Sequence, residues 1–395
     1  MISFDHAIEI IEAAARPFGT EAVALSEAAG RVLASPVIAA IDSPRADVSA
    51  MDGYAVRSAD LSEVPVALRV VGKSFPGSGY AGLIDHRECV RIFTGAPLPT
   101  GADRIVIQEQ VRVEGDLALI EVTSLAPLWV RARGADFRVN DAVLEPGRIL
   151  NAAALIAAGG ADAATVDVFH RPRLTLLTTG DELVSPGEAR ESALAVPDSV
   201  SLGLALLAEQ WGATIVRRER MRDDLPGMEA IAERSVGEAD VVVLAGGASV
   251  GERDYAKAMF EPLGLQLGFS KISMRPGKPA WFGTAAGAII LGLPGNPTSA
   301  LVAARLLLCP LLACLTGRGA NAALFWEDAT LATPLRDCDD RETFHRARLT
   351  QGSAALLSFQ ESHAQKALAE ADILLRQPAR SGSRSVGETA SVLRF

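Results

Sequence analysis

Residues 173–315 alternate short apolar runs with helical segments, and this alternation constrains the fold more than any other feature of the chain. The strand-like runs are RLTLLTT, ATIVRRERM, ADVVVLAGG and GAIILGLPG, of which the second is apolar only in its first half, and a helical segment follows or precedes each of them. Continuous apolar strands that alternate with helices are typical of a parallel sheet covered on both faces. The sequence therefore predicts a doubly wound, mainly parallel α/β domain over residues 171–318.

Further domains are expected on either side of it, because 395 residues, 49% of them hydrophobic, are too many for one ordinary core. Residues 43–136 consist of short β-rich runs between Gly and Pro turns, which indicates an inserted irregular β domain. Residues 1–42 and 137–170 are predicted to form one discontinuous, small helical and extended N-terminal domain. Past residue 319 the helices stop, and residues 319–395 predict a C-terminal β domain.

Charge, hydropathy and cysteine content exclude several classes of protein. A formal net charge of -10 argues against a nucleic-acid binder, because such proteins need a basic face to neutralise phosphates. No stretch of 18 apolar residues lacks both Pro and charge, and the first residues are amphipathic and acidic, so no membrane span or leader is expected. The four cysteines include no C-x-x-C, which favours neither zinc nor a disulfide framework. The expected location is cytoplasmic.

Polar residues and glycines follow each strand of the predicted α/β domain. Since the carboxyl ends of parallel strands meet at one edge of a sheet, these residues are expected to line a common site. They are Asp181 and Glu182, Asp223 and Asp224, the loop of Gly246, Gly247, Ser249 and Gly251 with Asp254, and Pro294, Gly295 and Asn296. A glycine loop that enters a helix suits an oxyanion, and the carboxylates suit Mg²⁺.

Each of these features also has a simpler interpretation. GDEL and RDD occur where helix starts and turns favour acidic residues anyway, and GGASVG matches neither a dinucleotide fingerprint nor a P-loop. The stretch SKISMRPGKPAWFG, which carries Lys271, Arg275 and Lys278, could be a solvated basic loop. Asp52 in SAMDGYAV and Asp136 in RARGADF could be ordinary turn carboxylates. The residues alone leave these alternatives open.

Taken in order, however, ten stretches between residues 30 and 300 resemble the molybdopterin molybdenumtransferase family, known as MoeA in bacteria and as the E domain of gephyrin in animals. They are GRVLA, SAMDGYAV, RIFTGAPLPTGAD, QEQ, RARGAD, TTGDEL, RDD, GGASVGERDY, RPGKP and LGLPGNPTSA. The resemblance implies a homodimer of four-domain subunits whose α/β domain is shared with the molybdopterin adenylyltransferases. It also implies Mg²⁺-dependent insertion of molybdate into adenylylated molybdopterin, with release of AMP.

The resemblance assigns roles by motif position. Acidic residues implied to be catalytic are Asp52, Asp136, Glu182, Asp223 and Asp254, of which Glu182, Asp223 and Asp52 are the expected metal ligands. Residues implied to bind the substrates are Thr94, Arg131, Asp198, Ser199, Gly246, Gly247, Ser249, Lys271, Arg275, Lys278, Pro294, Asn296 and Pro297. Implied partners are adenylylated molybdopterin, molybdate, a second subunit, a molybdopterin adenylyltransferase and molybdoenzyme apo-proteins.

Three positions depart from the family pattern. Val200 stands where an amide is usual, Ala135 replaces a carboxylate, and Arg275 occupies a position that is commonly Lys. Arginine keeps the charge and adds a planar fork suited to oxyanions. Because of the first two departures, the alternative function is that of a catalytically weakened cofactor-binding or scaffolding paralogue. The adenylyltransferase reaction itself is disfavoured by the N-terminal MDGYAV and RGAD stretches.

Overall fold

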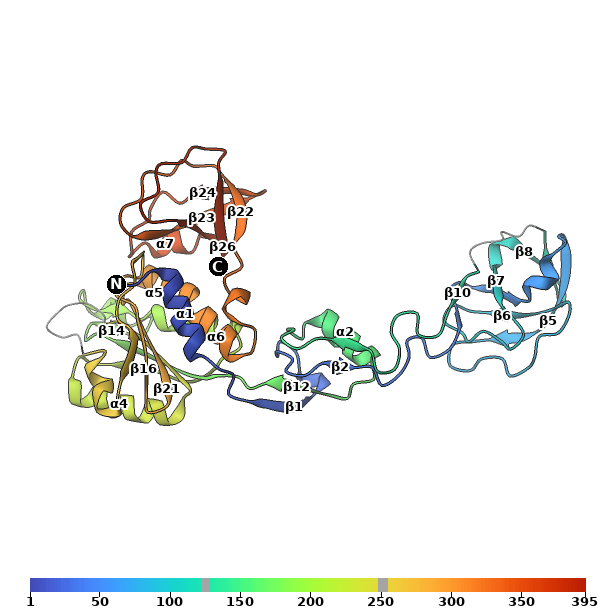
Figure 1. Ribbon diagram of the computed structural model, residues 1–395, viewed down its shortest axis with the longest axis horizontal. Helices are drawn as coiled ribbons and strands as arrows, with labels where there is room; N and C mark the ends of the chain where they lie inside the picture. Colours follow the sequence, from blue (N-terminus) through green and yellow to red (C-terminus); the bar gives the residue numbers. More distant parts are fainter. Residues whose placement is uncertain (122–127, 248–254) are drawn as a thin grey trace. The chain divides into compact units, whose positions relative to one another are not determined.

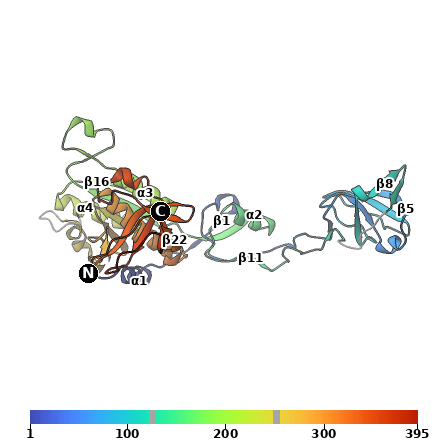
Figure 2. The ribbon, with the colours of Figure 1, turned by 90° about the horizontal axis from the view of Figure 1, so that it is seen from above.

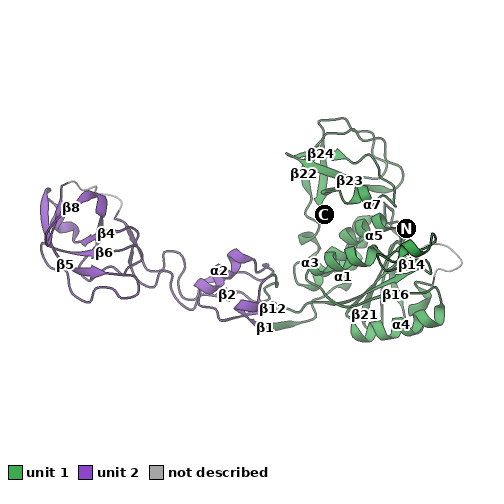
Figure 3. Cartoon of the chain, turned by 180° about the vertical axis from the view of Figure 1, so that it is seen from behind, with its two compact units in different colours: residues 1–21, 30–34, 168–395 green, residues 22–29, 35–167 purple. Residues whose placement is uncertain are grey.

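The computed structural model of the 395-residue chain describes residues 1–121, 128–247 and 255–395. Within them the chain forms two compact units, shown in different colours in Figure 3. The first contains residues 1–21, 30–34 and 168–395, and the second contains residues 22–29 and 35–167. Each unit is described by itself.

A six-stranded sheet forms the centre of the α/β domain in the first unit (Figure 1). Four neighbouring strands are parallel, and the last two are antiparallel, so the sheet is mainly parallel as the sequence predicts. In spatial order the strands are β16 (Thr214–Met221), β13 (Arg173–Thr179), β17 (Val241–Ala245), β21 (Ala288–Leu293), β20 (Trp281–Ala285) and β18 (Gln266–Phe269). A short parallel pair, β14 (Leu183–Val184) and β15 (Val196–Pro197), follows β13.

Helices cover both faces of this sheet because its strands are apolar on both sides. Along β17, Val241 and Val243 pack into one hydrophobic cluster, whereas Val242 and Leu244 pack into another. The first cluster contains residues of α1 (Phe4–Ala14), α3 (Val200–Gln210), α5 (Pro297–Ala303) and α6 (Cys309–Leu315), and the second contains residues of α4 (Leu225–Glu238). Local sequence starts these helices: the Asp224 carboxylate, for example, accepts a hydrogen bond from the N–H of Gly227 at the beginning of α4.

The helical run Pro297–Leu315 joins α5 and α6 through a π-helical turn at Ala304–Leu308. It is long and apolar enough to cross a membrane by length and composition. In this fold 94% of its most apolar 18-residue segment is buried, and its leucines contribute to the first hydrophobic cluster. The run is therefore a core helix of the α/β domain.

The C-terminal domain of the first unit is a small barrel, which is coloured orange to red in Figures 1 and 2. Five strands close on themselves, because β25 pairs with both β23 and β26. The strands are β23 (Glu342–Thr350), β24 (Ser353–Leu356), β22 (Glu327–Leu331), β26 (Thr389–Arg394) and β25 (Ile373–Gln377), with the short helix α7 (Gln365–Leu368) between β24 and β25. A sixth strand, β19 (Met274–Arg275), comes from the basic stretch and pairs with β23 in parallel.

The second unit contains a six-stranded sheet within residues 53–120. This sheet has buried apolar side chains on both faces, which form two separate clusters. In spatial order the strands are β7 (Arg104–Ile107), β4 (Gly53–Val56), β6 (Glu88–Ile92), β5 (Val66–Ser74), β9 (Leu117–Ile120) and β8 (Val111–Glu114). The other elements of this unit are β2 (Val37–Ile38) with β11 (Ala142–Leu144), β3 (Val48–Ser49) with β10 (Val130–Arg131), and α2 (Ala152–Gly160). The paired strands β1 (Thr20–Ala24) and β12 (Thr165–Phe169) have residues in both units.

Candidate functional site

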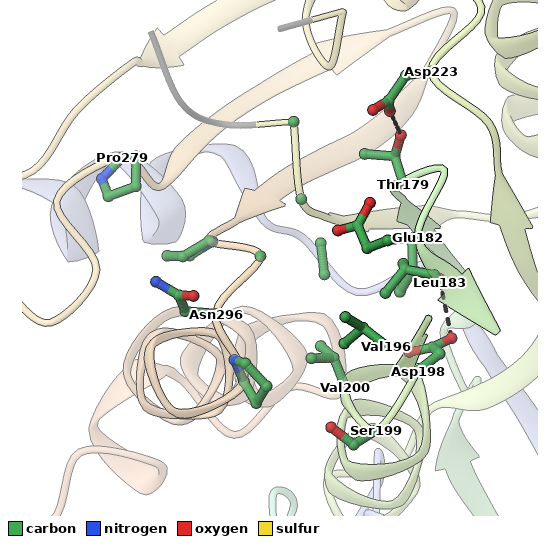
Figure 4. A pocket seen from close by; sticks show the side chains of 18 of the residues that line it. Thr179, Glu182, Leu183, Val196, Asp198, Ser199, Val200, Asp223, Pro279 and Asn296 are labelled. Carbon is green, nitrogen blue, oxygen red and sulfur yellow. Dashed lines mark hydrogen bonds between the residues drawn. The ribbon is translucent and has the colours of Figure 1, made fainter. Parts of the chain in front are cut away.

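A cavity of about 770 Å³ lies at the carboxyl edge of the α/β sheet. It is bounded by the segments that follow β13, β16, β17 and β21, as expected where parallel strands end together. Figure 4 shows the side chains that line it. The sequence-predicted residues among the lining are Glu182, Asp198, Ser199, Asp223, Gly246, Gly247, Lys271, Lys278, Pro294, Asn296 and Pro297.

Acidic side chains form one side of this cavity. The Thr179 hydroxyl donates a hydrogen bond to Asp223 Oδ1, and the N–H of Asp223 donates to Asp181 Oδ1 at 3.2 Å. Glu182 is exposed and points toward the centre of the cavity in Figure 4. Among the described residues, no three His, Cys, Asp or Glu side chains are grouped so as to hold a metal by themselves. Glu182 and Asp223 nevertheless fit Mg²⁺, which commonly takes one or two carboxylates together with water and substrate phosphates.

Asp198 lines the cavity but has its oxygens engaged by the protein. It is 6% exposed, and Oδ2 accepts a hydrogen bond from the Thr178 hydroxyl at 3.1 Å. Its Oδ1 accepts from the N–H of Ser201 at 3.1 Å, in the first turn of α3. Asp198 thus fixes the start of α3. It forms part of the cavity wall, but its carboxylate oxygens are already engaged by Thr178 and Ser201. Val200 follows in the same turn and also lines the cavity.

At Gly246, which lines the cavity, the backbone comes very close to the backbone of Thr179. Its φ of +103° lies in the region that favours glycine, and a Cβ there would be 2.8 Å from the carbonyl oxygen of Thr179. The neighbouring Gly295 approaches the same backbone, since its added Cβ would lie 3.3 Å from the Cα of Gly246. The ends of β13, β17 and β21 therefore approach one another closely here, and a side chain at position 246 would clash with the backbone of Thr179.

The basic stretch contributes a further part of the cavity lining. The N–H of Ile272 donates to the carbonyl oxygen of Lys278 at 3.1 Å, which closes the segment 272–278 into a compact loop. Lys271 and Lys278 are exposed and line the cavity. The lining of this one cavity accordingly contains both ammonium groups and carboxylates.

A second cavity, of about 550 Å³, lies between the basic stretch and the C-terminal barrel. It shares Lys278, Pro279, Pro294 and Asn296 with the first cavity, so the two spaces adjoin. Arg275 lines only the second cavity of the two. The part of its lining that comes from the C-terminal barrel is Arg341, Thr343, Phe344, His345, Arg346, Gln360, Glu361 and Ser362.

Arg346 is the most unusual residue of this second cavity, and sequence reasoning missed it. It is 1% exposed, and burial lowers the pKa of its guanidinium. One terminal nitrogen donates to the carbonyl oxygens of Phe359 (3.2 Å) and Glu361 (3.3 Å). Its Nε is buried and has no hydrogen-bond partner among the residues that the structure describes. The sequence carries only a weak signal for this residue, because Arg346 is one of three arginines in RETFHRARL and arginine is rarely fully buried without a partner.

Two side-chain hydrogen bonds join residues 362–365, which directly follow the hydrogen-bond partners of Arg346, to the α/β domain. Asn296 Nδ2 donates to Ser362 Oγ at 3.1 Å, and Ser199 Oγ donates to Gln365 Oε1 at 3.3 Å. Neither Ser362 nor Gln365 is singled out by the sequence. Both bonds connect the rim of the first cavity with the C-terminal domain of the same chain.

The second unit brings together Asp52 and Thr94. Asp52 Oδ1 accepts hydrogen bonds from the N–H and the hydroxyl of Thr94, each at 2.7 Å, and these bonds lower the pKa of the carboxyl. Arg91 lies over the rings of Tyr54 and Phe93, with its Cζ 5.1 and 4.9 Å from the ring centroids. This patch combines an ionised carboxylate with a stacked cation.

Two further described residues of that unit, Asp136 and Arg131, are predicted site residues. Asp136 is exposed and borders a shallow hollow together with Asp141. Arg131 is exposed on β10, opposite Val48 of β3. Ser249 and Asp254 fall outside the residues that the structure describes.

Comparisons with known proteins cover the whole chain. Three family models match: MoeA N-terminal region (domain I and II) at residues 2–160, probable molybdopterin binding domain at residues 175–313, and MoeA C-terminal region (domain IV) at residues 328–395. A Haemophilus influenzae protein named molybdopterin molybdenumtransferase is 34% identical over 402 residues, covering 100% of this chain and 99% of that protein. Molybdopterin molybdenumtransferase 2 of Mycobacterium tuberculosis is 33% identical, with 90% of each chain covered.

Solved structures show the same fold. The molybdopterin biosynthesis MoeA protein of Pyrococcus horikoshii matches over 100% of both chains, with a TM-score of 0.86 and 23% identity. A second structure from that organism has a TM-score of 0.82 and 28% identity, and covers 100% of this chain and 99% of the other. These matches confirm the predicted fold class, which combines a mainly parallel α/β domain with β domains.

Proposed function

Because this chain belongs to the molybdopterin molybdenumtransferase family, we propose that it inserts molybdenum from molybdate into adenylylated molybdopterin and releases AMP. The chain is a transferase of molybdenum cofactor biosynthesis. The observation that carries the finer proposal is the pair of adjoining cavities, whose linings contain both carboxylates and cations. A nucleotide-linked substrate and a small oxyanion need two such neighbouring spaces.

In the first cavity we assign the adenylylated substrate. The glycine backbone after β17 and the loop ammonium groups of Lys271 and Lys278 suit its phosphates. Mg²⁺ would be held by Glu182 and Asp223 and would offset the repulsion between a pyrophosphate and a molybdate dianion. Thr179 and Asp181 hold Asp223 in place for this role.

In the second cavity we assign molybdate. Arg346 supplies a buried cation with an unpaired N–H, and Lys278 stands at the border of both spaces. Anions in a partly buried, cationic space are held more strongly than in water, because the local dielectric is lower. An oxygen of molybdate or of water is then the nucleophile that attacks phosphorus, so that no nucleophilic side chain is required.

The wider assignments follow from the family and stay proposals. We propose a homodimer in the cytoplasm, with molybdopterin adenylyltransferase and molybdoenzyme apo-proteins as partners. Light scattering at micromolar concentration tests the first point, and a monomer would contradict it. The role of Asp52 as a metal ligand is likewise a prediction, tested by Asp52→Ala.

The deciding experiment supplies the purified protein with adenylylated molybdopterin, Mg²⁺ and molybdate at near-physiological concentration. AMP release and active cofactor are followed together. We expect AMP release that requires both Mg²⁺ and molybdate, and we expect Glu182→Ala to abolish it without unfolding the protein. Glu191→Ala, in an exposed turn of the same segment, is the matched control and should keep full turnover. Substrate binding without any such AMP release would instead favour the scaffolding paralogue.

A further inference from the structure

Arg275 already has an anionic partner inside the protein. Its terminal nitrogen lies 2.5 Å from Asp339 Oδ2, and both side chains are about half exposed, at 50% and 44%. Arg275 lines the second cavity, whereas Asp339 is not part of that lining among the described residues. The guanidinium is therefore shared between the cavity and a carboxylate beside it.

The backbone fixes both members of this pair. Arg275 belongs to β19 and lies in register with Thr343 of β23. Asp339 precedes β23 by a short turn, in which its Oδ1 accepts a hydrogen bond from the N–H of Arg341 at 3.0 Å. The N–H of Glu342 donates to the carbonyl oxygen of Ser273 at 3.2 Å and joins the two segments. The pair thus exists because one edge of the C-terminal barrel is formed by the basic stretch.

The same carboxylate also approaches a second cation of the cavity. Asp339 Oδ2 lies 4.0 Å from a terminal nitrogen of Arg341, which lines the cavity together with Lys278 and Arg346. Hydrogen bonding to the Arg341 N–H and the neighbouring guanidinium groups lower the pKa of Asp339, so the carboxylate is ionised at neutral pH. An oxyanion that enters this space meets cations, one of which is already neutralised.

We propose that Asp339 is an internal counter-ion that an oxyanion must displace from Arg275 before that arginine can bind it. Asp339 is then a positioning residue that lowers oxyanion affinity and never touches the ligand. It lets a cluster of cations exist without a ligand, and it returns Arg275 to its resting position when the oxyanion has left. This inference rests on the proposed function, in which the second cavity receives molybdate.

Displacement and simple charge repulsion predict different results. Breaking the Arg275–Asp339 pair costs the same free energy whichever oxyanion replaces Asp339. Through-space repulsion by Asp339 instead scales with the charge of the oxyanion. Molybdate and perrhenate are both tetrahedral oxyanions, with charges of −2 and −1, so a comparison of the two separates these mechanisms.

The test is calorimetric titration of the full-length protein with molybdate alone and with perrhenate alone. The variants are Asp339→Asn, Arg275→Gln, the double variant, and Asp340→Asn as control. Asn at position 339 keeps the oxygen that accepts the Arg341 N–H, and Asp340→Asn removes an equal charge from the same turn. Asp340 Oδ1 lies 4.0 Å from Arg341 Nε, and in the described part of the chain Asp340 forms no ion pair with Arg275, which makes the control a close one.

We expect Asp339→Asn to lower the Kd of both oxyanions by one common factor of about two to five, the range for a half-exposed ion pair. Asp340→Asn should change neither Kd, and Asp339→Asn should have no effect when Arg275 is already Gln. The inference is overturned if Asp339→Asn leaves the Kd of the oxyanions unchanged or raises it. It is also overturned if the Kd for molybdate falls by nearly the square of the factor for perrhenate, or if Asp339→Asn still lowers the Kd when Arg275 is Gln. If neither the wild-type protein nor Asp339→Asn binds an oxyanion, the assignment of molybdate to this cavity fails together with it, whereas binding without a change on Asp339→Asn removes the counter-ion alone.

Discussion

The side-chain amide of Asn296 donates a hydrogen bond to Ser362 Oγ, at a distance of 3.1 Å. Asn296 lines both cavities, at the start of α5, whereas Ser362 comes from the C-terminal barrel and lines only the second cavity of the two. The contact therefore lies where the space assigned to the adenylylated substrate meets the space assigned to molybdate. Through this contact the C-terminal domain contributes directly to the site.

Asn296→Ala should reduce turnover about tenfold and leave thermal stability nearly unchanged. The hydrogen bond is exposed, so its loss costs at most about 1 kcal/mol of folding free energy. Turnover should fall because the C-terminal domain loses its contact with α5 at the point where the two cavities adjoin. Ser362→Ala should have the same effect, and the double variant should be no worse than either single one. The measurement is kcat and KM for molybdate in the AMP-release assay. Asn321→Ala, at an exposed position of the same unit, is the control, and additive losses would contradict the idea of one shared contact.

Gly292→Ala should destabilise the α/β domain strongly. Gly292 lies opposite Trp281 across β20 and β21, and a Cβ there would be 1.9 Å from the indole Nε1. Trp281 is fully buried and cannot move aside, so the cost should reach about 3 kcal/mol or more. Differential scanning calorimetry would show a lower Tm for the transition of this domain. Gly237→Ala in α4 has open space around it and should add up to about 1 kcal/mol of folding free energy, so that Tm should stay the same or rise. Equal effects of the two variants would disprove the packing argument.

The neighbourhood of the sheet-edge residues could be predicted from the sequence because it follows from local rules. Strands recognised by their apolar runs place whatever follows them at one edge, and so Glu182, Asp223 and Asn296 line one cavity. Asp198 shows the limit of the same reasoning. Its position at the cavity was predictable, but the engagement of both its oxygens by Thr178 and Ser201 depends on side-chain geometry that no pattern records.

Pairings over a long sequence distance could not be predicted. The sequence is compatible with a solvated loop at the basic stretch, yet Met274 and Arg275 form a strand that pairs with Glu342 and Thr343 of the C-terminal domain. A two-residue strand carries no periodic signal, and its partner lies in a domain with little motif content. For the same reason the sequence predicted neither Arg346 nor Asp339 beside the predicted cations.

Acidification should destabilise the C-terminal barrel through His345. Burial lowers the pKa of this imidazole below its ordinary value of 6.5, and the nearby Arg275 and Arg346 lower it further, while the hydrogen bond to Gln377 opposes the shift. The unfolded chain therefore binds more protons than the folded one as pH falls through 6.5, and this part of the stability is present above 6.5 and lost toward the lower pKa of the folded state.

The measurement for His345 is the Tm of the barrel transition between pH 7.5 and pH 5. His345→Gln should flatten this dependence, because glutamine has no proton to take up. His6→Gln removes an exposed histidine from α1 and should leave the dependence as it is. A pH dependence that survives in His345→Gln would assign the acid sensitivity to other groups.

Arg346→Met should remove molybdate binding while the barrel still folds. The guanidinium is buried, its Nε has no partner among the described residues, and its terminal nitrogen holds the carbonyl oxygens of Phe359 and Glu361. Methionine fills a similar volume and avoids the cost of burying a charge, which limits the loss of folding free energy. Without the cation, we expect the Kd for molybdate to rise more than tenfold and turnover to fall about 100-fold.

Arg348, two residues further along β23, provides the matched control for Arg346. It is exposed and pairs with Glu370 at 3.0 Å on the surface, so Arg348→Met should change molybdate binding and turnover less than twofold. Arg346→Lys separates charge from shape: it keeps a cation but loses the fork that reaches both carbonyl oxygens, and should recover part of the binding. Calorimetric titration gives the Kd values, and circular dichroism shows whether the barrel is intact. A folded Arg346→Met protein that binds molybdate as tightly as the wild type would remove the second cavity as the molybdate site.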